Sequence, residues 1–379
     1  MTPPPPLFWG DLAPGRYAVG FRVLYLRDPT RPWSRDGGAA AAIGRPVRVY
    51  VWYPGAKPGS QARPMPYGAY LASRGPSGFR ELETEIAAAE RASWLADLAE
   101  LTPHAKDVFD RLAATPTAAY WEGAPAGGAF PLVLYASGKA ARSDAGAVLA
   151  EYLASHGYVV ATLMQIGPAA TNLELGSSPP DLELRGQDCV FALGALRRLP
   201  QVDAAHLAVA GHSAGAEVAL LLACRIAGTG AVVSLDGSYG TVSGARVIRS
   251  MATWRPDAVR CPILDVRRAA GSQGAELDPA VLDSLAGADR TLGVFREAWH
   301  GDFTEWATIA RQLRIPQPPG SGSHTREIGF AVNQHAYRAV LAFLDGHLRN
   351  DRVALASIRD EVLAVPGATY VTKPGVRSR

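Results

Sequence analysis

A serine at the centre of a five-residue motif is the first candidate for chemistry in this sequence. Residues 211–215 read Gly-His-Ser-Ala-Gly, with Ser213 in the middle. An apolar run typical of a strand, 207–210, leads into the motif, and a run typical of a helix, 217–225, leads out of it. This context predicts a sharp strand-to-helix turn, with the free N–H groups of the helix N-terminus pointing at the reacting centre. Ser213 is therefore predicted to act as a nucleophile.

A serine hydroxyl needs a base that accepts its proton, usually a histidine held by a carboxylate. In the chain order serine, acid, histidine, the base lies downstream, where the sequence offers His300, His324, His335 and His347. His300 follows the predicted strand 291–295 by a short loop, and catalytic residues gather at such strand ends. We therefore predict His300 as the base. The Gly/Ser-rich surroundings of His324 indicate a flexible loop, and His335 and His347 belong to the final predicted helix.

Three aspartates are candidates for the acid that orients the histidine. Asp236 follows the predicted strand 231–235, Asp265 lies inside the predicted strand 263–266, and Asp278 lies beyond it. An aspartate in the middle of a strand would face a layer of helices rather than the open edge of the sheet. Asp236 is the prediction, although Asp-Gly is also a common turn sequence, and Asp265 and Asp278 stay open as alternatives.

The negative oxygen that forms during attack on a carbonyl needs two backbone N–H donors. One is expected from Ala214, directly after the serine. The other is expected from residues 137–139, the loop after the predicted strand 132–135. We predict the N–H of Lys139 as this second donor, with its side chain in solvent. His212, inside the motif, is expected to pack or to form a hydrogen bond rather than to act as the base.

Strand-like and helix-like runs alternate along most of the chain. Strands are predicted at 17–26, 47–52, 132–135, 158–164, 207–210, 231–235, 263–266 and 291–295, and helices at 145–156, 182–199, 217–225 and 335–348. This alternation predicts an α/β fold with a mostly parallel central sheet that helices cover on both faces.

The chain is predicted to be a single domain, 1–379, with three additions. A helical segment at 81–120 is expected as an insert or cap, and it should roof or flank the site together with the loop 165–180. A proline-rich, extended segment is expected at 1–15, and a C-terminal extension at 351–379.

Composition excludes several classes of function. The chain has 379 residues, of which 48% are hydrophobic, enough for one large core. Its 38 basic and 35 acidic residues are well mixed, which argues against nucleic-acid binding, and it has no apolar run of about 18 residues that could span a membrane. Cys189, Cys224 and Cys261 lack metal-ligand spacing and are expected to be small buried side chains, so no metal and no cofactor is implied.

The cellular location and the oligomeric state stay open from sequence. The N-terminus has neither the basic region nor the apolar core of a signal peptide, so we expect a cytoplasmic protein or the mature part of an exported one.

Several motifs together resemble those of α/β-hydrolases. They are Arg-Pro-Val-Arg-Val-Tyr-Val-Trp-Tyr-Pro at 45–54, Phe-Pro-Leu-Val-Leu-Tyr-Ala-Ser-Gly at 130–138, Ser-His-Gly-Tyr-Val-Val at 155–160, and the serine motif with its strand at 207–215. The closest resemblance is to the branch of platelet-activating-factor acetylhydrolase-like enzymes, which are related to dienelactone hydrolases. In that family the acid follows the strand after the serine motif and the histidine precedes a Phe by three positions, which implies Asp236, and His300 with Phe303.

The resemblance implies an α/β-hydrolase fold and a serine esterase that acts on short-chain or phospholipid-type acyl esters, a small-molecule or lipid substrate, through an acyl-enzyme. Two departures concern the substrate. Ser137-Gly138 replaces the family's His-Gly and is followed by Lys139 instead of an apolar residue, and the loop 165–180 lacks the usual Asp-His-Pro-Gly. A peptidase, an acyltransferase or a catalytically inactive binding protein would be alternative uses of the same residues.

Overall fold

A single twisted sheet forms the centre of the molecule. The computed structural model describes residues 6–34, 43–72, 75–163, 166–167, 175–274, 276–318 and 320–376. Within these ranges the strands are β1 (Ala18–Trp33), β2 (Ile43–Gly55), β3 (Ala119–Trp121), β4 (Phe130–Ala136), β5 (Val159–Leu163), β6 (Val202–His212), β7 (Thr229–Leu235), β8 (Ile263–Arg268), β9 (Arg290–Phe295) and β10 (Thr369–Lys373).

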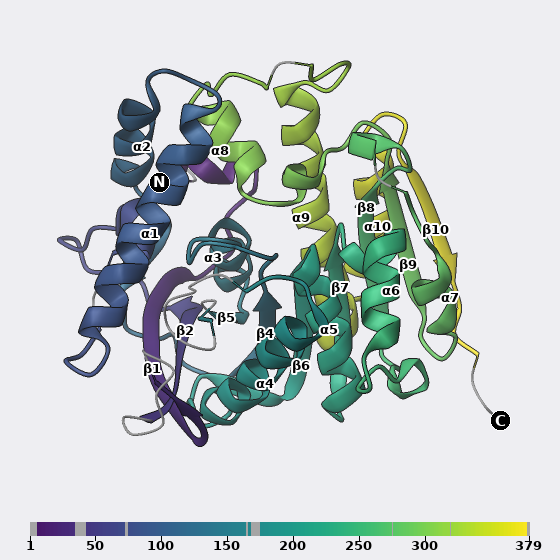
Figure 1. The fold of residues 1–379 in the computed structure, drawn as a ribbon, viewed down its shortest axis with the longest axis horizontal. Helices are drawn as coiled ribbons and strands as arrows, with labels where there is room; N and C mark the ends of the chain where they lie inside the picture. The colour runs from purple at the N-terminus through teal and green to yellow at the C-terminus, as the bar shows by residue number, and fades with distance from the viewer. Residues whose placement is uncertain are drawn as a thin grey trace.

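The strands follow the order β10-β9-β8-β7-β6-β4-β5-β2-β1-β3 across the sheet (Figure 1). All neighbours from β5 to β9 pair in parallel, whereas β2 is antiparallel to β1 and β5, and β10 is antiparallel to β9. The carboxyl ends of β4, β6, β7, β8 and β9 therefore meet at one edge of the sheet, and this edge carries the candidate site.

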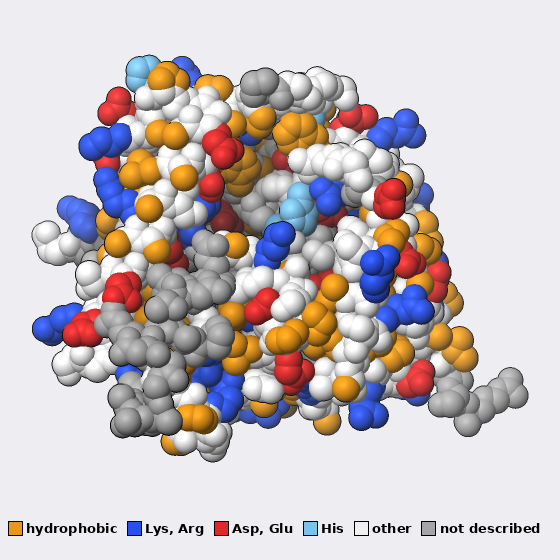
Figure 2. Space-filling view, viewed as in Figure 1, with side chains coloured by type: hydrophobic (Ala, Val, Ile, Leu, Met, Phe, Trp, Pro, Cys, Tyr) orange, Lys and Arg blue, Asp and Glu red, His pale blue; other side chains and the backbone are white. Residues whose placement is uncertain are grey.

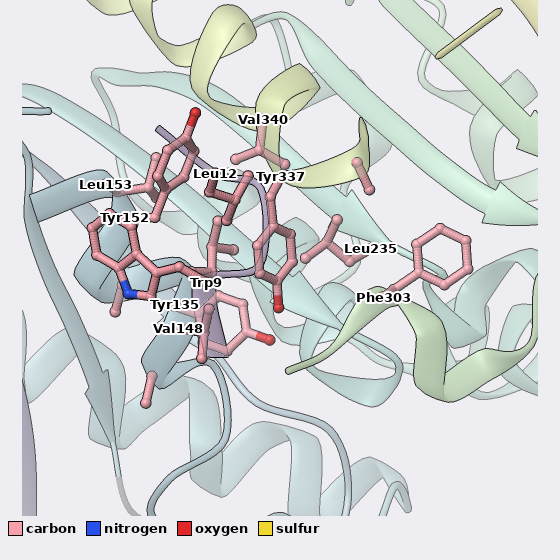
Figure 3. Close-up of a cluster of buried hydrophobic side chains, with 14 of the residues drawn as sticks. Trp9, Leu12, Tyr135, Val148, Tyr152, Leu153, Leu235, Phe303, Tyr337 and Val340 are labelled. Carbon is pink, nitrogen blue, oxygen red and sulfur yellow. The ribbon is translucent and has the colours of Figure 1, made fainter. Parts of the chain in front are cut away.

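Helices cover both faces of the sheet. They are α1 (Arg80–Ala99), α2 (Ala105–Ala114), α3 (Ala147–Ser155), α4 (Pro179–Leu196), α5 (Ala214–Arg225), α6 (Val242–Ser250), α7 (Ala280–Ser284), α8 (Trp306–Gln312), α9 (Arg326–Leu348) and α10 (Arg352–Leu363). Alternate side chains of β6 point to opposite faces. Leu207 and Val209 pack with α4 to α7, whereas Ala208 and Ala210 pack with α3, α9 and α10. Figure 3 shows part of the latter core, where Trp9 and Tyr337 lie among other aromatic and aliphatic side chains.

The prediction of a mostly parallel sheet with helices on both faces is confirmed. Several elements are longer than their sequence patterns indicate, and β1 and α9 show the reasons. β1 continues to Trp33 through two prolines, because a register shift between Asp28 and Pro32 lets the strand keep pairing with β2. α9 begins at Arg326, capped by the Thr325 side chain, and its first turns contain a glycine and polar residues that hide the helical pattern.

Both ends of the described chain belong to the folded body. The segment expected to be extended at 1–15 forms a short 3-10 helix at Leu7–Trp9, and residues 1–5 lie outside the described ranges. The Trp9 side chain is 1% exposed, and its Nε1 donates a hydrogen bond to Glu151 Oε2 of α3 (2.8 Å). The C-terminal stretch contributes α10 and the edge strand β10, and residues 377–379 lie outside the description.

Replacing Trp9 by Phe tests this N-terminal anchor. The Phe ring keeps apolar contacts, but the buried carboxylate of Glu151 keeps only its bonds from the Tyr70 hydroxyl and the Ala118 N–H. We expect the free energy of unfolding to fall by about 1–3 kcal/mol, measured by urea denaturation. The control Leu7→Ala, at a side chain that is 46% exposed, should change it by less than about 0.5 kcal/mol. Wild-type stability of Trp9→Phe would show that the anchor contributes nothing.

Candidate active site

Ser213 lies on a strained turn between β6 and α5. Its backbone has φ 56° and ψ −128°, a conformation that a residue with a side chain rarely adopts and that costs on the order of 1–3 kcal/mol. Glycines on both sides make the turn possible. A Cβ on Gly215 would lie 1.9 Å from the carbonyl oxygen of Ala136, and a Cβ on Gly211 would lie 2.2 Å from the carbonyl oxygen of Gly215. The serine is thus held where three backbone segments touch.

The structure brings Asp236 and His300 together. His300 begins the short 3-10 helix after β9, and its Nδ1 lies 2.5 Å from Oδ2 of Asp236, which directly follows β7. Burial on its own raises the pKa of Asp236. The hydrogen bond from His300 and the charges of His300 and Arg268 outweigh this effect, so the pKa is lowered overall. A carboxylate at this place accepts a hydrogen bond from Nδ1–H of His300, which leaves Nε2 free to take a proton.

Neither alternative acid is hydrogen-bonded to His300 among the described residues. The Asp265 side chain is fully buried and pairs with Arg267 on the side of the sheet that α4 to α7 cover. Oδ1 of Asp278 accepts the N–H of Ala280 at the start of α7 (2.8 Å). Asp236 is therefore the carboxylate of the three that can orient the imidazole.

The serine oxygen points to a second hydroxyl. Oγ of Ser213 lies 3.2 Å from Oγ of Ser238, and no hydrogen bond joins it to His300 in the described part of the chain. Ser213 and His300 nevertheless line the same two cavities. Nucleophile and base often come into hydrogen-bond contact only when a substrate is bound.

Two side chains fix the backbone of His300. Nε2 of His212 lies 3.1 Å from the carbonyl oxygen of His300, and the two rings are 4.5 Å apart. Burial, followed by the nearby His300, lowers the pKa of His212 to about 3, so this imidazole is neutral and donates from Nε2. On the other side, Oε1 of Gln273 accepts the N–H of His300 (2.8 Å).

The expectation that His324 lies in a flexible loop is wrong. Its side chain is 5% exposed and stacks on Trp299 with ring centres 4.2 Å apart. Its Nε2 lies 2.8 Å from Oδ2 of Asp302, which also accepts the N–H of Trp299 (2.6 Å). Because Trp299 and Asp302 flank His300 in the chain, this group clamps the loop that carries it. The glycines and serines around His324 hide the buried side chain from sequence reasoning.

The proposed oxyanion donors lie beside the serine. Ala214 is the first residue of α5, so its N–H lies outside the hydrogen bonds of the helix. The loop after β4 passes against the serine, since a Cβ on Gly138 would lie 3.4 Å from Cβ of Ser213. Lys139 follows in this loop and lines both cavities that contain Ser213. The role of the N–H groups of Ala214 and Lys139 as oxyanion donors stays a prediction.

The loop after β4 is also tied to α1. Oε1 of Glu90 accepts hydrogen bonds from the backbone N–H and the hydroxyl of Ser143 (2.8 and 2.5 Å). Nε1 of Trp94 donates to Oδ2 of Asp144 (3.1 Å), and the guanidinium of Arg142 lies 4.1 Å from the Trp94 ring centre. The predicted helical insert therefore rests on the same loop that carries Lys139.

Sequence reasoning missed three charged residues around the site. Arg268 lies 3.2 Å from Asp236 at the end of β8, and Arg185 of α4 donates hydrogen bonds to the carbonyl oxygens of Ser137 and Gly138. Glu217 lies on α5 and lines the smaller cavity. A signal existed for Glu217, because it is the one acidic residue in the apolar helix run after the motif and lies one helical turn beyond Ser213.

Two cavities of different character meet at Ser213. The larger, about 540 Å³, lies between α1, the loop after β4 and α8, and its apolar wall includes Trp94, Leu101, Tyr135 and Trp306. The smaller, about 300 Å³, lies between the residues after β7 and α6 and is mostly polar. Figure 2 shows this face hollowed in its middle, with a histidine side chain at the hollow. Of the loop 165–180, Ser177 lines the smaller cavity, and residues 165 and 168–174 lie outside the described ranges.

The described ranges lack two other kinds of feature. No cluster of three or more His, Cys, Asp or Glu side chains there could bind a metal ion. None of the helices there has the length and apolar character needed to cross a membrane. Cys189 is buried, Cys224 and Cys261 are partly buried, and all three are free thiols.

Comparisons with known proteins agree with this architecture. Among solved structures, a ferulic acid esterase from Streptomyces cinnamoneus matches with a TM-score of 0.61, covering 95% of this chain and 98% of that chain at 22% sequence identity. The chain has the α/β-hydrolase fold. A family model described as Chlorophyllase matches residues 114–271, a range that contains Ser213 and Asp236 and ends before His300. No curated protein matches the sequence. Neither match names the acetylhydrolase-like branch, so that narrower placement stays a prediction.

The buried, neutral His212 predicts a specific sensitivity to acid. Its pKa is about 3 in the folded protein against 6.5 as the ordinary value. Between these pH values the unfolded chain binds the extra proton, so stability that is fully present above about pH 6.5 is lost as the pH falls, by up to about 1.4 kcal/mol per pH unit.

His212→Gln removes this titration, so its free energy of unfolding should fall less steeply than that of the wild type between about pH 7 and about pH 4, measured by urea denaturation. The control His104→Gln, at an exposed position, should keep the wild-type slope. Equal slopes for both variants would rule out His212 as the source.

Proposed function

We propose that this protein is a serine hydrolase that cleaves carboxylic esters, with Ser213 as the nucleophile, His300 as the base and Asp236 as the acid. The observation that carries the proposal is the 2.5 Å contact between Asp236 and His300 beside a serine on a strained strand-to-helix turn. The two matches, a ferulic acid esterase and a Chlorophyllase family model, support ester hydrolysis.

In the first half of the proposed reaction, the ester carbonyl lies between Ser213 and the two backbone donors. The serine oxygen leaves its hydrogen bond with Ser238 and attacks the carbonyl carbon, and its proton passes to Nε2 of His300. The carbonyl oxygen becomes negative and is held by the N–H groups of Ala214 and Lys139. The bond to the alcohol oxygen then breaks, and His300 returns the proton to the leaving alcohol.

In the second half, water hydrolyses the acyl-enzyme. His300 takes a proton from the water as its oxygen attacks the acyl carbon, and then gives this proton to the departing oxygen of Ser213. Throughout, Asp236 stabilises the imidazolium that forms twice in the cycle. Its own hydrogen bond from the Arg268 N–H (3.1 Å) and its ion pair with the same residue keep it charged and in place.

The two cavities indicate the kind of ester. The larger cavity has the volume of a typical small-molecule site, and its aromatic and aliphatic wall suits an apolar group. We propose that one half of the substrate, a short acyl chain or the acyl group of a phospholipid-type ester, lies there. The smaller, polar cavity takes the other half of the ester.

Ser213→Ala tests the nucleophile. Because the acyl-enzyme can no longer form, turnover of p-nitrophenyl butyrate should fall by about 10³-fold or more, and labelling by a fluorophosphonate probe should disappear. Ser238→Ala is the control, because it removes only the hydroxyl that contacts Ser213, and this variant should still be labelled. A wild-type protein that is not labelled would favour a catalytically inactive binding protein.

Asp236→Asn tests the acid. An asparagine cannot stabilise the imidazolium or fix the useful tautomer of His300, so kcat for p-nitrophenyl butyrate should fall by about 10⁴-fold in folded protein. Asp278→Asn is the matched control, because an amide oxygen can still accept the Ala280 N–H, and its kcat should stay close to that of the wild type. A small effect of Asp236→Asn on kcat would show that another residue is the acid.

A further inference from the structure

A buried carboxyl group without a partner lies in the smaller cavity. Glu217 is only 1% exposed, and neither of its carboxyl oxygens has a hydrogen-bond partner among the residues that the structure describes. It stands on α5 four residues after Ser213, so both side chains lie on the same side of the helix. Both residues line the smaller cavity.

Folding alone does not explain this carboxyl group. An unsatisfied buried carboxyl group destabilises a protein, and such groups are rare unless they have a function. Burial raises the pKa of Glu217 to about 8, although the nearby charge of Arg185 opposes the shift. At neutral pH the group is therefore mostly protonated, with one O–H donor and one free carbonyl acceptor.

A neighbouring hydroxyl group of the cavity already has partners, in contrast to Glu217. The Thr241 hydroxyl donates to the carbonyl oxygen of Ser238 and accepts the N–H of Gly244. Gly244 also keeps the approach to the carboxyl group open, since a Cβ there would lie 2.8 Å from Oε1 of Glu217. Of the two carboxyl groups in the described lining of this cavity, Asp236 is bonded to His300 and Arg268, and Glu217 is the one without a partner.

The surrounding charges restrict what can bind. Three basic side chains, Lys139, Arg267 and Arg268, line the cavity against one ionised carboxylate, Asp236, and this excess of positive charge disfavours a cationic group. An alkyl group would leave the carboxyl group unsatisfied, and an anion could accept its O–H but could not donate to its carbonyl oxygen. A neutral hydroxyl group does both, because it donates one hydrogen bond and accepts others.

We infer that Glu217 is a specificity-determining residue that binds a hydroxyl group on one half of the ester substrate. The inference rests on the proposed function, because the ester must lie at Ser213 for its other part to reach the smaller cavity. The hydroxyl group can belong to the acyl half or to the alcohol half, and both place the same chemistry against Glu217.

Matched esters with and without a hydroxyl group test the inference. One pair differs in the acyl half, p-nitrophenyl butyrate and p-nitrophenyl 3-hydroxybutyrate. The other pair, butyl acetate and 4-hydroxybutyl acetate, differs in the alcohol half, and its hydrolysis is measured by the release of acetate. For each pair, the ratio of kcat/KM for the hydroxylated ester to that for the plain ester is measured in the wild type, Glu217→Gln and Glu217→Leu.

We expect the wild type to prefer the hydroxylated ester by about tenfold or more in one pair, since a site built to bind a hydroxyl rejects the analogue that lacks it. Glu217→Leu should bring that ratio close to one, and Glu217→Gln, which keeps a donor and an acceptor, should retain part of the preference. Because no native partner is lost, Glu217→Leu should also melt at a temperature no lower than the wild type.

A wild type without preference in either pair overturns the inference, as does an unchanged ratio in Glu217→Leu. A lower melting temperature of Glu217→Leu together with an unchanged ratio assigns Glu217 a structural role instead. If Glu217→Leu does not fold, the nearly isosteric Glu217→Gln decides: a ratio equal to that of the wild type in both pairs overturns the inference.

If the fluorophosphonate probe labels Ser213 and plain esters are cleaved, these outcomes reject the inference while the proposed function stands. Absence of labelling and turnover rejects both.

Discussion

The close approach of three backbone segments around Ser213 is the constraint on which the site depends. The end of β6, the start of α5 and the end of β4 come so near to one another that a single Cβ on Gly215 would lie 1.9 Å from the carbonyl oxygen of Ala136. Only glycine fits there. The contact fixes the positive φ of Ser213 and brings the loop with Lys139 against this serine. The energy stored in this turn, on the order of 1–3 kcal/mol, is supplied by the two apolar cores that hold the strands and helices in place.

The position of His300 depends on elements that are distant in sequence. Asp236 comes from the end of β7, His212 from the end of β6, and His324 from the turn before α9. Each makes one hydrogen bond to His300 or to its loop, so the imidazole is fixed in direction and in tautomer before any ligand arrives. Because the imidazole is already oriented, the proposed reaction requires less rearrangement of the site.

Sequence reasoning succeeded where the information is local. The strands of the sheet and its helices have short-range sequence patterns. The rule that parallel strands present their carboxyl ends at one edge was enough to select Asp236 and His300 as the candidate acid and base. The structure brings these two together, whereas their catalytic roles stay proposals. Sequence reasoning failed where a single side chain acts on residues far away in the chain. Examples are the ion pair of Arg268 with Asp236, the hydrogen bond of His324 to Asp302 and the hydrogen bond of Trp9 to Glu151. None of these leaves a periodic pattern in the sequence. Glu217 is different, because its spacing from Ser213 was visible but its lack of a partner was not.

The hydrogen bonds between α1 and the loop after β4 have a consequence for how this protein could diversify. The wall that limits the larger cavity is not an independent lid, because Glu90 and Trp94 hold Ser143 and Asp144, a few residues beyond Lys139. A substitution in α1 that admits a larger substrate would also shift the backbone next to the proposed oxyanion donor. Under the proposed function, substrate size and reaction rate are therefore coupled traits, and an evolutionary path toward bulkier esters would have to change α1 and the loop after β4 together.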